Sequence, residues 1–299
     1  MNVLNVNSLT KSYRRNRAIH NLSLQVDKGQ VYGLLGPNGS GKTTTLGIIL
    51  GILSATSGSY SWFEGVSPDQ ARRKIGALLE KPNFYPWLSA RQNLKIVAAI
   101  KNTDTRLIDG VLTNVNLSHA ANQKFEHFSL GMKQRLAIAS CLLGDPEVLV
   151  LDEPTNGVDA EGIAEIRSLI LQLREQGKTI ILASHMLDEV EKVCSHVGII
   201  HHGAVAESGD INQVIGAGET IELRCNDNLK AQQFLQDRNE IKGLKVEKDM
   251  IHLSVANDFD TAQFNKLLVE NQIYPSHLTK RSQSLEKHFL ELLEKSRAK

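Results

Sequence analysis

The chain has 299 residues, 41% of them hydrophobic, and carries 34 basic against 33 acidic side chains. This length can bury a large core and predicts two domains. The charge balance lacks the basic excess of nucleic-acid-binding proteins, so we expect no nucleic acid as a partner.

Two further absences in the sequence bear on where the protein works. Its three cysteines are scattered, which indicates a reducing compartment and no cysteine metal site. No signal-peptide pattern opens the chain, and no uncharged apolar run approaches the ~20 residues that a membrane span needs. We therefore expect any membrane component to be a separate polypeptide.

The chain begins with alternating apolar residues. This pattern predicts strands over residues 3–9 and 22–26, closed by a turn at Asp27-Lys28-Gly29. We expect them to form a small antiparallel sheet that carries Tyr13 in a loop. The nearby Arg14, Arg15 and Arg17 could form a phosphate-binding patch, but a solvated loop explains them as well.

A glycine-rich segment follows a short apolar strand at residues 31–35. It reads Gly36-Pro37-Asn38-Gly39-Ser40-Gly41-Lys42-Thr43, the phosphate-binding P-loop pattern G-x-x-x-x-G-K-T. The glycines let backbone N–H groups turn inward, and a helix over residues 44–53, starting with Thr44, offers its free amides to a phosphate. Lys42 is expected to reach the β- and γ-phosphate oxygens, and the Thr43 hydroxyl to ligate Mg²⁺. The segment predicts a nucleotide site.

The middle of the chain predicts helices. Ser89-Ala90-Arg91-Gln92 matches a capping box that starts one helix, and a second is expected over residues 105–117. A third helix over residues 130–143, capped by Ser129, would turn its free amides outward as an anion site. Because this site lies on an insertion distant from its own P-loop, we expect it to bind the γ-phosphate of a second copy, in a head-to-tail homodimer.

Two apolar strands end in polar side chains suited to catalysis. The run over residues 147–151 is followed by Asp152 and Glu153 and then by a forced turn, Pro154-Thr155-Asn156-Gly157. Asp152 is placed to ligate Mg²⁺, and Glu153 to polarise an attacking water as general base. An ordinary strand end with solvated acids is the alternative, which the turn disfavours. A further apolar strand, over residues 180–184, ends at His185.

The remaining segments predict structural elements and no catalytic site. His201-His202-Gly203 lies between two strand patterns and predicts a hairpin turn in preference to a metal pair. After Gly216-Ala217-Gly218 the order β-α-β-β-α-β predicts a small ferredoxin-like domain, followed by a helix with one apolar face. We therefore assign residues 1–218 to an ATP-binding domain and residues 219–299 to a regulatory or dimerisation domain.

Taken in order, these motifs resemble the nucleotide-binding subunits of ATP-binding-cassette (ABC) transporters over roughly residues 1–218. Residues 36–43 are similar to the Walker A motif and residues 148–153 to Walker B. The segment Ser129-Leu130-Gly131-Met132-Lys133-Gln134 is similar to the family signature, LSGGQ. The resemblance implies an α/β P-loop ATPase with an antiparallel β subdomain and a helical subdomain, using ATP and Mg²⁺.

The resemblance also implies roles for further residues. Tyr13 would stack on adenine, Ser129 and Gly131 of the signature and Asp159 of the D-loop would contact ATP, and His185 would hold the γ-phosphate. Glu80 stands where the family usually has a metal-facing glutamine; the alternative is a solvated loop acid. Phe84-Tyr85-Pro86-Trp87-Leu88 follows that loop, where the family docks its membrane partner.

Leu130, Met132 and Glu80 depart from the usual family pattern and resemble the bacitracin-resistance and lantibiotic-immunity export branch. This implies an ATPase on the cytoplasmic face of the membrane that powers an exporter through a separate permease. Lipid or polysaccharide export, or motility-linked secretion, is an alternative. A soluble ABC ATPase of DNA repair or translation is a weaker one, because the chain shows one module and no heptad run.

Overall fold

The computed structural model describes residues 1–14, 16–80, 82–215, 219–236, 238, 240–255, 259–282 and 284–297. It divides into two compact units, Met1–Ile211 and Asn212–Lys299. The predicted linker at residues 216–218 lies outside the described residues, as does Arg15. The assignment of a function to each domain stays a prediction.

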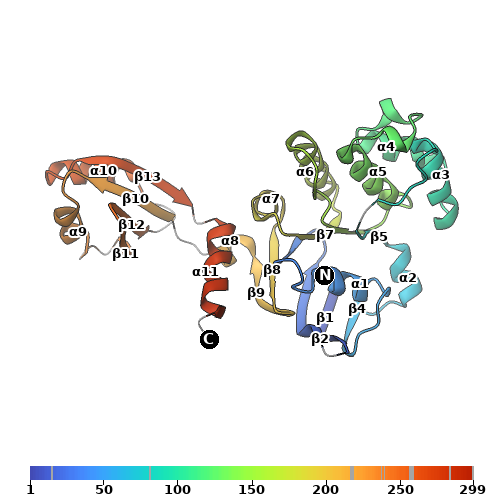
Figure 1. The fold of residues 1–299 in the computed structure, drawn as a ribbon, viewed down its shortest axis with the longest axis horizontal. Coiled ribbons are helices and arrows are strands. Elements are labelled where there is room, and N and C mark those ends of the chain that lie inside the picture. The colour runs from blue at the N-terminus through green and yellow to red at the C-terminus, as the bar shows by residue number, and fades with distance from the viewer. Residues whose placement is uncertain are drawn as a thin grey trace. The chain divides into compact units, whose positions relative to one another are not determined.

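A six-stranded sheet forms the centre of the larger unit, in the order β5-β6-β7-β3-β8-β9 (Figure 1). The strands are β3 (Val31–Leu35), β5 (Ile75–Leu78), β6 (Val148–Asp152), β7 (Thr179–Ser184), β8 (His196–His201) and β9 (Ala204–Asp210). All neighbouring pairs are parallel except β8 and β9, which form the hairpin predicted around His202. Strands β3, β6 and β7 are buried along their whole length, which is why their sequences are continuous apolar runs.

Strand register brings the predicted catalytic segments to one edge of this sheet. Leu35 of β3 pairs with Ser184 of β7, and Ala183 of β7 pairs with Asp152 of β6. The P-loop, the acidic pair and His185 each follow one of these strands. The sheet therefore places all three segments at its carboxyl edge, where open α/β sheets bind ligands.

A second, antiparallel sheet has the order β2-β1-β4, from β1 (Asn2–Tyr13), β2 (Asn16–Asp27) and β4 (Ser57–Trp62). Its first two strands confirm the prediction. Tyr13 was wrongly placed in a loop: it ends β1 and pairs with Asn16 of β2. The two sheets and helix α1 share one core of aliphatic side chains, which includes Leu4, Leu22, Leu46, Val150 and Ile181.

The larger unit contains the helices α1 (Lys42–Ile49), α2 (Pro68–Arg73), α3 (Ala90–Lys101), α4 (Leu107–Asn114), α5 (Leu130–Leu142), α6 (Ala160–Glu175) and α7 (Leu187–Val193). Helices α3, α4 and α5 form a group of their own in Figure 1. The Ser89 capping box and the Ser129 cap are confirmed. Helices α1 and α4 end earlier than predicted, because Gly51 and Asn116 after them adopt left-handed backbone, with φ of 74° and 54°.

The smaller unit is the predicted α+β fold. Strands β10 (Glu219–Cys225), β11 (Ile241–Glu247), β12 (Met250–Val255) and β13 (Pro275–Ser282) form an antiparallel sheet in the order β11-β12-β10-β13. Helices α9 (Asn228–Gln236) and α10 (Thr261–Glu270) connect them, and α11 (Leu285–Arg297) follows. This unit has its own core of buried side chains, among them Leu223, Leu253, Phe264 and Leu268. The short α8 (Ile211–Ile215) begins where the two units divide.

Candidate active site

The P-loop turns tightly enough that two of its glycines have no room for a side chain. A Cβ at Gly36 would lie 2.4 Å from the Ile200 carbonyl oxygen, and one at Gly41 would lie 2.8 Å from the Ala18 carbonyl oxygen. Gly41 also has φ of 110°, in the left-handed region, immediately before α1. Pro37, Asn38 and Gly39 form the exposed tip of the loop. The glycines of the motif are therefore required by the backbone path.

Lys42 is buried inside this loop, with only 6% of its side chain exposed. Its ammonium donates a 2.7 Å hydrogen bond to the Gly36 carbonyl oxygen and lies 3.6 Å from Oε1 of Glu153. Because the loop curls around it, the cation stands where a bound phosphate would be cradled. Lys42 would exchange these protein oxygens for phosphate oxygens on nucleotide binding.

Asp152 and Thr43 offer oxygens suited to a divalent cation. Burial raises the pKa of the Asp152 carboxyl, opposed by a hydrogen bond from the Thr43 side chain. Oδ1 of Asp152 is buried without a hydrogen-bond partner, as is Oγ of Ser40 in the P-loop. Buried polar atoms rarely lack partners, and a carboxylate with a hydroxyl beside it is a donor set that Mg²⁺ prefers. These residues fit the ion.

Glu153 lies one residue on and points elsewhere. Its φ is 49°, in the left-handed region, and its amide donates to the Ala183 carbonyl oxygen at 2.9 Å. Oε2 lies 2.8 Å from Nδ1 of His185. Because a carboxylate only accepts, Nδ1 carries the proton. The turn therefore places the predicted base between Lys42 and the predicted switch histidine.

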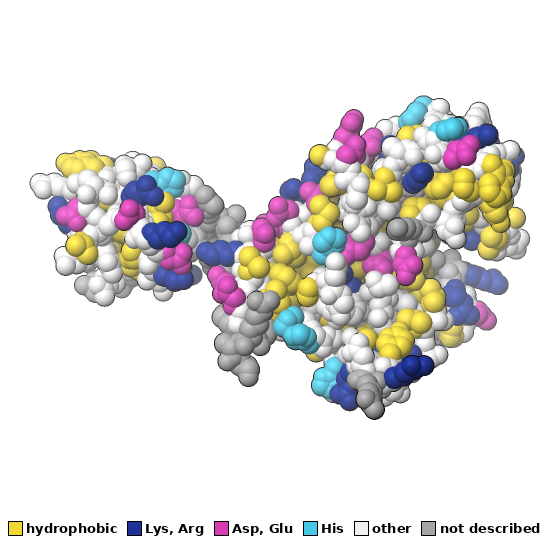
Figure 2. Space-filling model, viewed as in Figure 1, with side chains coloured by type: hydrophobic (Ala, Val, Ile, Leu, Met, Phe, Trp, Pro, Cys, Tyr) yellow, Lys and Arg dark blue, Asp and Glu magenta, His cyan; other side chains and the backbone are white. Residues whose placement is uncertain are grey.

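Glu80 follows β5 at the same sheet edge. It is exposed with φ of 57°, and the pKa of the Asp152 carboxyl, raised mainly by burial, is raised to a smaller extent by the negative charge of Glu80. Acidic side chains gather on this face of the larger unit, around β5, β7 and α1 (Figure 2). Glu80 thus follows a strand that ends at this edge of the sheet, as the metal interpretation requires.

The signature and the D-loop lie together, at the starts of α5 and α6. The Ser129 hydroxyl accepts from the Met132 amide at 3.2 Å, and Oδ1 of Asp159 accepts from the Gly162 amide at 3.1 Å. A Cβ at Gly131 would lie 3.4 Å from the Gly162 Cα. The glycines thus let the two helix starts approach closely, and both present amides at one place.

Tyr13 is 44% exposed at the end of β1. Nζ of Lys11 lies 4.9 Å from the centroid of its ring. The ring is available for stacking, as the adenine role requires.

The aromatic segment after Glu80 is held by a residue that sequence reasoning missed. The side chain of the buried Asn93, on α3, accepts from the Tyr85 amide at 2.9 Å and donates to the carbonyl oxygens of Tyr85 and Leu88. Tyr85 and Trp87 are 49% and 62% exposed, with ring centroids 5.5 Å apart. The sequence offered one signal for this role, since Asn93 is a polar residue on the apolar face of the predicted helix. Two large aromatic rings are therefore fixed on the surface.

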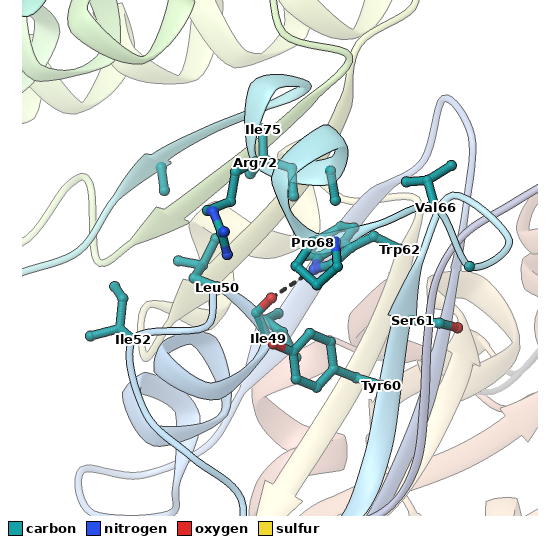
Figure 3. Close-up of a pocket in the computed structure, with 13 residues that line it drawn as sticks. Ile49, Leu50, Ile52, Tyr60, Ser61, Trp62, Val66, Pro68, Arg72 and Ile75 are labelled. Atoms are coloured by element: carbon teal, nitrogen blue, oxygen red, sulfur yellow. Dashed lines mark hydrogen bonds between the residues drawn. The ribbon is translucent and has the colours of Figure 1, made fainter. Parts of the chain in front are cut away.

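An apolar cavity of about 590 Å³ lies apart from the P-loop, at the far end of α1 (Figure 3). Trp62 closes one side, and its indole N–H donates to the Ile49 carbonyl oxygen at 2.6 Å. Tyr60, Val66, Pro68 and Ile75 also line it. No local pattern in the sequence marks this cavity, because its walls come from the end of α1 and from β4, α2 and β5.

Comparison with known proteins gives the family. The ABC transporter family matches residues 19–156. Bacitracin transport ATP-binding protein BcrA of Bacillus licheniformis is 38% identical over 97% of both chains. The chain belongs to the ATP-binding proteins of ABC transporters. It is an ATPase whose ATP hydrolysis is coupled to transport.

Other proteins of this ABC family are also similar to the chain. Lantibiotic transport ATP-binding protein SrtF of Streptococcus pyogenes is 41% identical over 68% of this chain and 89% of its own. The solved structure of cbiO1 from Clostridium perfringens, part of the ABC transporter complex cbiONQ, covers 71% of this chain and 90% of its own at a TM-score of 0.66 and 29% identity. The cassette MJ0796, solved as a dimer, covers 70% of this chain and 99% of its own, at a TM-score of 0.62 and 26% identity. Over the described ranges, every helix is too short or too polar to traverse a lipid bilayer.

Proposed function

We propose that this ATPase drives an exporter of peptide antibiotics or similar drugs, through a separate membrane permease. The observation that carries the catalytic part is the meeting of Lys42, Glu153 and His185 at one sheet edge, with Glu153 Oε2 2.8 Å from His185 Nδ1. The similarity to proteins named for bacitracin and lantibiotic transport supports the substrate class.

In the proposed mechanism each residue acts on the phosphates or on the attacking water. Lys42 and the P-loop amides stabilise charge that develops on the transferred phosphoryl group. Glu153 accepts the proton of the water, and His185 orients the γ-phosphate. Thr43, Asp152 and Glu80 would hold Mg²⁺, which neutralises charge on the β- and γ-phosphates when bound.

The proposed site is completed by a second copy of the chain. Ser129, Gly131 and Asp159 stand at helix starts whose amides suit an anion, and they belong to segments other than the P-loop. Two copies arranged head to tail would each place this surface on the partner's ATP. Closure on ATP and opening after hydrolysis would give the permease two states to read.

The permease is proposed to dock at residues 84–88, on the cytoplasmic face of the membrane. Tyr85 and Trp87 present exposed rings there, and Asn93 fixes their backbone. Co-purification of the tagged chain with its permease from detergent extracts is the test. Trp87→Ser should reduce recovery of the permease while leaving ATP binding unchanged. Absence of any integral membrane partner with the unaltered chain would favour a soluble ABC ATPase instead.

Glu80 is expected to link the metal site to this docking segment. Glu80→Gln keeps a metal-facing oxygen, so nucleotide binding should change little and basal hydrolysis should persist. Glu80→Ala removes the oxygen and should lower the substrate-stimulated ATPase rate of the assembled transporter roughly tenfold, the effect of about 1.4 kcal/mol. Glu64→Ala is a matched control, because Glu64 is also an exposed loop acid with positive φ, 59°. If both Glu80 variants behave like wild type, Glu80 is a solvated loop acid.

Removal of the smaller unit is expected to spare the nucleotide site. Its buried core is separate from that of the larger unit, and the proposed site residues all precede it. A chain ending after residue 218 should bind Mg-ATP with nearly wild-type affinity in calorimetry, whereas dimer stability or regulation should suffer. A folded truncation that no longer binds nucleotide would show that residues 219–299 complete the site.

A further inference from the structure

An ion pair joins the two helices that follow the D-loop and the switch histidine. Nη1 of Arg167, on α6, lies 3.0 Å from both carboxylate oxygens of Glu189, on α7. Glu189 is 15% exposed and Arg167 30%. Lys192 adds a second cation at 2.9 Å. A carboxylate held at both oxygens and largely shielded from water is more strongly fixed than a surface pair.

The pair lies where α6 packs against β7 and α7. Residues of the Walker B turn and of α6 meet residues of β7 and α7 around a void of only about 10 Å³. The Thr155 hydroxyl lies 3.6 Å from the Met186 sulfur, and the Met186 amide donates to the Ser184 hydroxyl at 3.0 Å. Ile170, Leu182 and Val190 beside it are buried, so a shift of one element against the other would open a void.

Each helix begins beside a residue of the proposed site. Helix α6 starts at its cap, Asp159 of the D-loop, and α7 starts at Leu187, with only Met186 between it and His185. Because so short a connection leaves little freedom, the position of α7 sets the position of the His185 ring. That ring in turn holds Glu153 at 2.8 Å.

We propose that Arg167 and Glu189 are positioning residues that lock α7 to α6, so that the D-loop and the switch histidine move together when two copies close on ATP. The inference rests on the proposed role of His185. In this arrangement a displacement of Asp159 at the dimer contact is passed through α6 and the ion pair to His185. Neither residue touches nucleotide; each acts through the placement of the histidine.

The test is a double-mutant cycle in the full chain, with steady-state ATPase kinetics. Arg167→Gln and Glu189→Gln should each lower kcat roughly tenfold and leave KM for ATP within about twofold. The double variant should be no slower than either single one, because both remove the same contact. Arg167→Lys retains the charge and should recover much of the rate.

Lys178→Gln is the matched control. Lys178 is 15% exposed and pairs with the exposed Asp145 at 2.5 Å, and its ammonium also donates to the Pro146 carbonyl oxygen at 2.7 Å, beyond the opposite end of β6 and β7. Its loss removes an ion pair away from the proposed site, so it should lower the Tm modestly and leave kcat unchanged. The inference is overturned if Arg167→Gln lowers only the Tm, or if the two glutamine substitutions multiply to roughly a hundredfold loss. His185→Ala separates the two proposals: retained hydrolysis there would refute the role of His185 itself.

Discussion

Glu153→Gln is expected to lower the kcat of ATP hydrolysis by roughly 10²- to 10⁴-fold, the usual contribution of a general base. Glutamine keeps the length of the side chain and an oxygen that can accept from His185 Nδ1, but it cannot take a proton from water. Because Lys42, the P-loop and Asp152 are untouched, the affinity for Mg-ATP should remain near the wild-type value. Phosphate release under saturating ATP measures the first effect, and calorimetry the second.

Glu147→Gln is the control for this prediction, because Glu147 precedes the opposite end of β6 and pairs with Lys74 on the surface. It should hydrolyse ATP at the wild-type rate. Near-wild-type turnover by the Glu153 variant would assign the base to another residue.

Gly131→Asp is expected to abolish hydrolysis through the partner's site. The new carboxylate would face the γ-phosphate of the other copy and repel it, which blocks closure. Gly131→Ala adds the same Cβ, 3.3 Å from Val158 Cγ1 and 3.4 Å from Gly162 Cα, without the charge. The alanine variant therefore measures the steric effect alone and should keep most of the activity, whereas the aspartate variant should bind ATP but not turn it over.

Mixing Gly131→Asp with Lys42→Ala tests whether the lesions act in different copies. In each mixed dimer the unaltered P-loop of the Gly131→Asp copy faces the unaltered signature of the Lys42→Ala copy. The second site combines both lesions. Random pairing gives half mixed dimers with one competent site each, so the mixture should reach at most roughly one quarter of the wild-type rate. Activity that never rises above that of the separate variants at any ratio would argue against a shared site, as would full activity in either variant alone.

The candidate site could be predicted from the sequence because its parts are local. Lys42, Asp152, Glu153 and His185 each follow a buried apolar strand, and the carboxyl ends of parallel strands meet at one edge. Ser129 was found for a similar reason, since a helix cap is specified within four residues.

The parts that sequence reasoning missed depend on contacts with other segments, which no pattern within one segment shows. Strand β4 is rich in serine and glycine, and only Tyr60 and Trp62 alternate with its polar residues, so the sequence signal is short; pairing with β1 fixes the strand. Tyr13 belongs to β1 because it pairs with Asn16 of β2. Asn93 takes its role from Tyr85 and Leu88 in the segment just before α3, and the Arg167–Glu189 pair joins two different helices.

The molar mass of the Glu153→Gln protein in solution, with and without Mg-ATP, tests the central claim that two copies enclose ATP between them. Light scattering should give about the monomer mass of 33.1 kDa without nucleotide, and twice that mass with Mg-ATP, because the variant closes but does not hydrolyse. Addition of the Gly131→Asp lesion to the same chain should return it to the monomer mass. A monomer that binds Mg-ATP fully and never dimerises at any protein concentration would contradict the account.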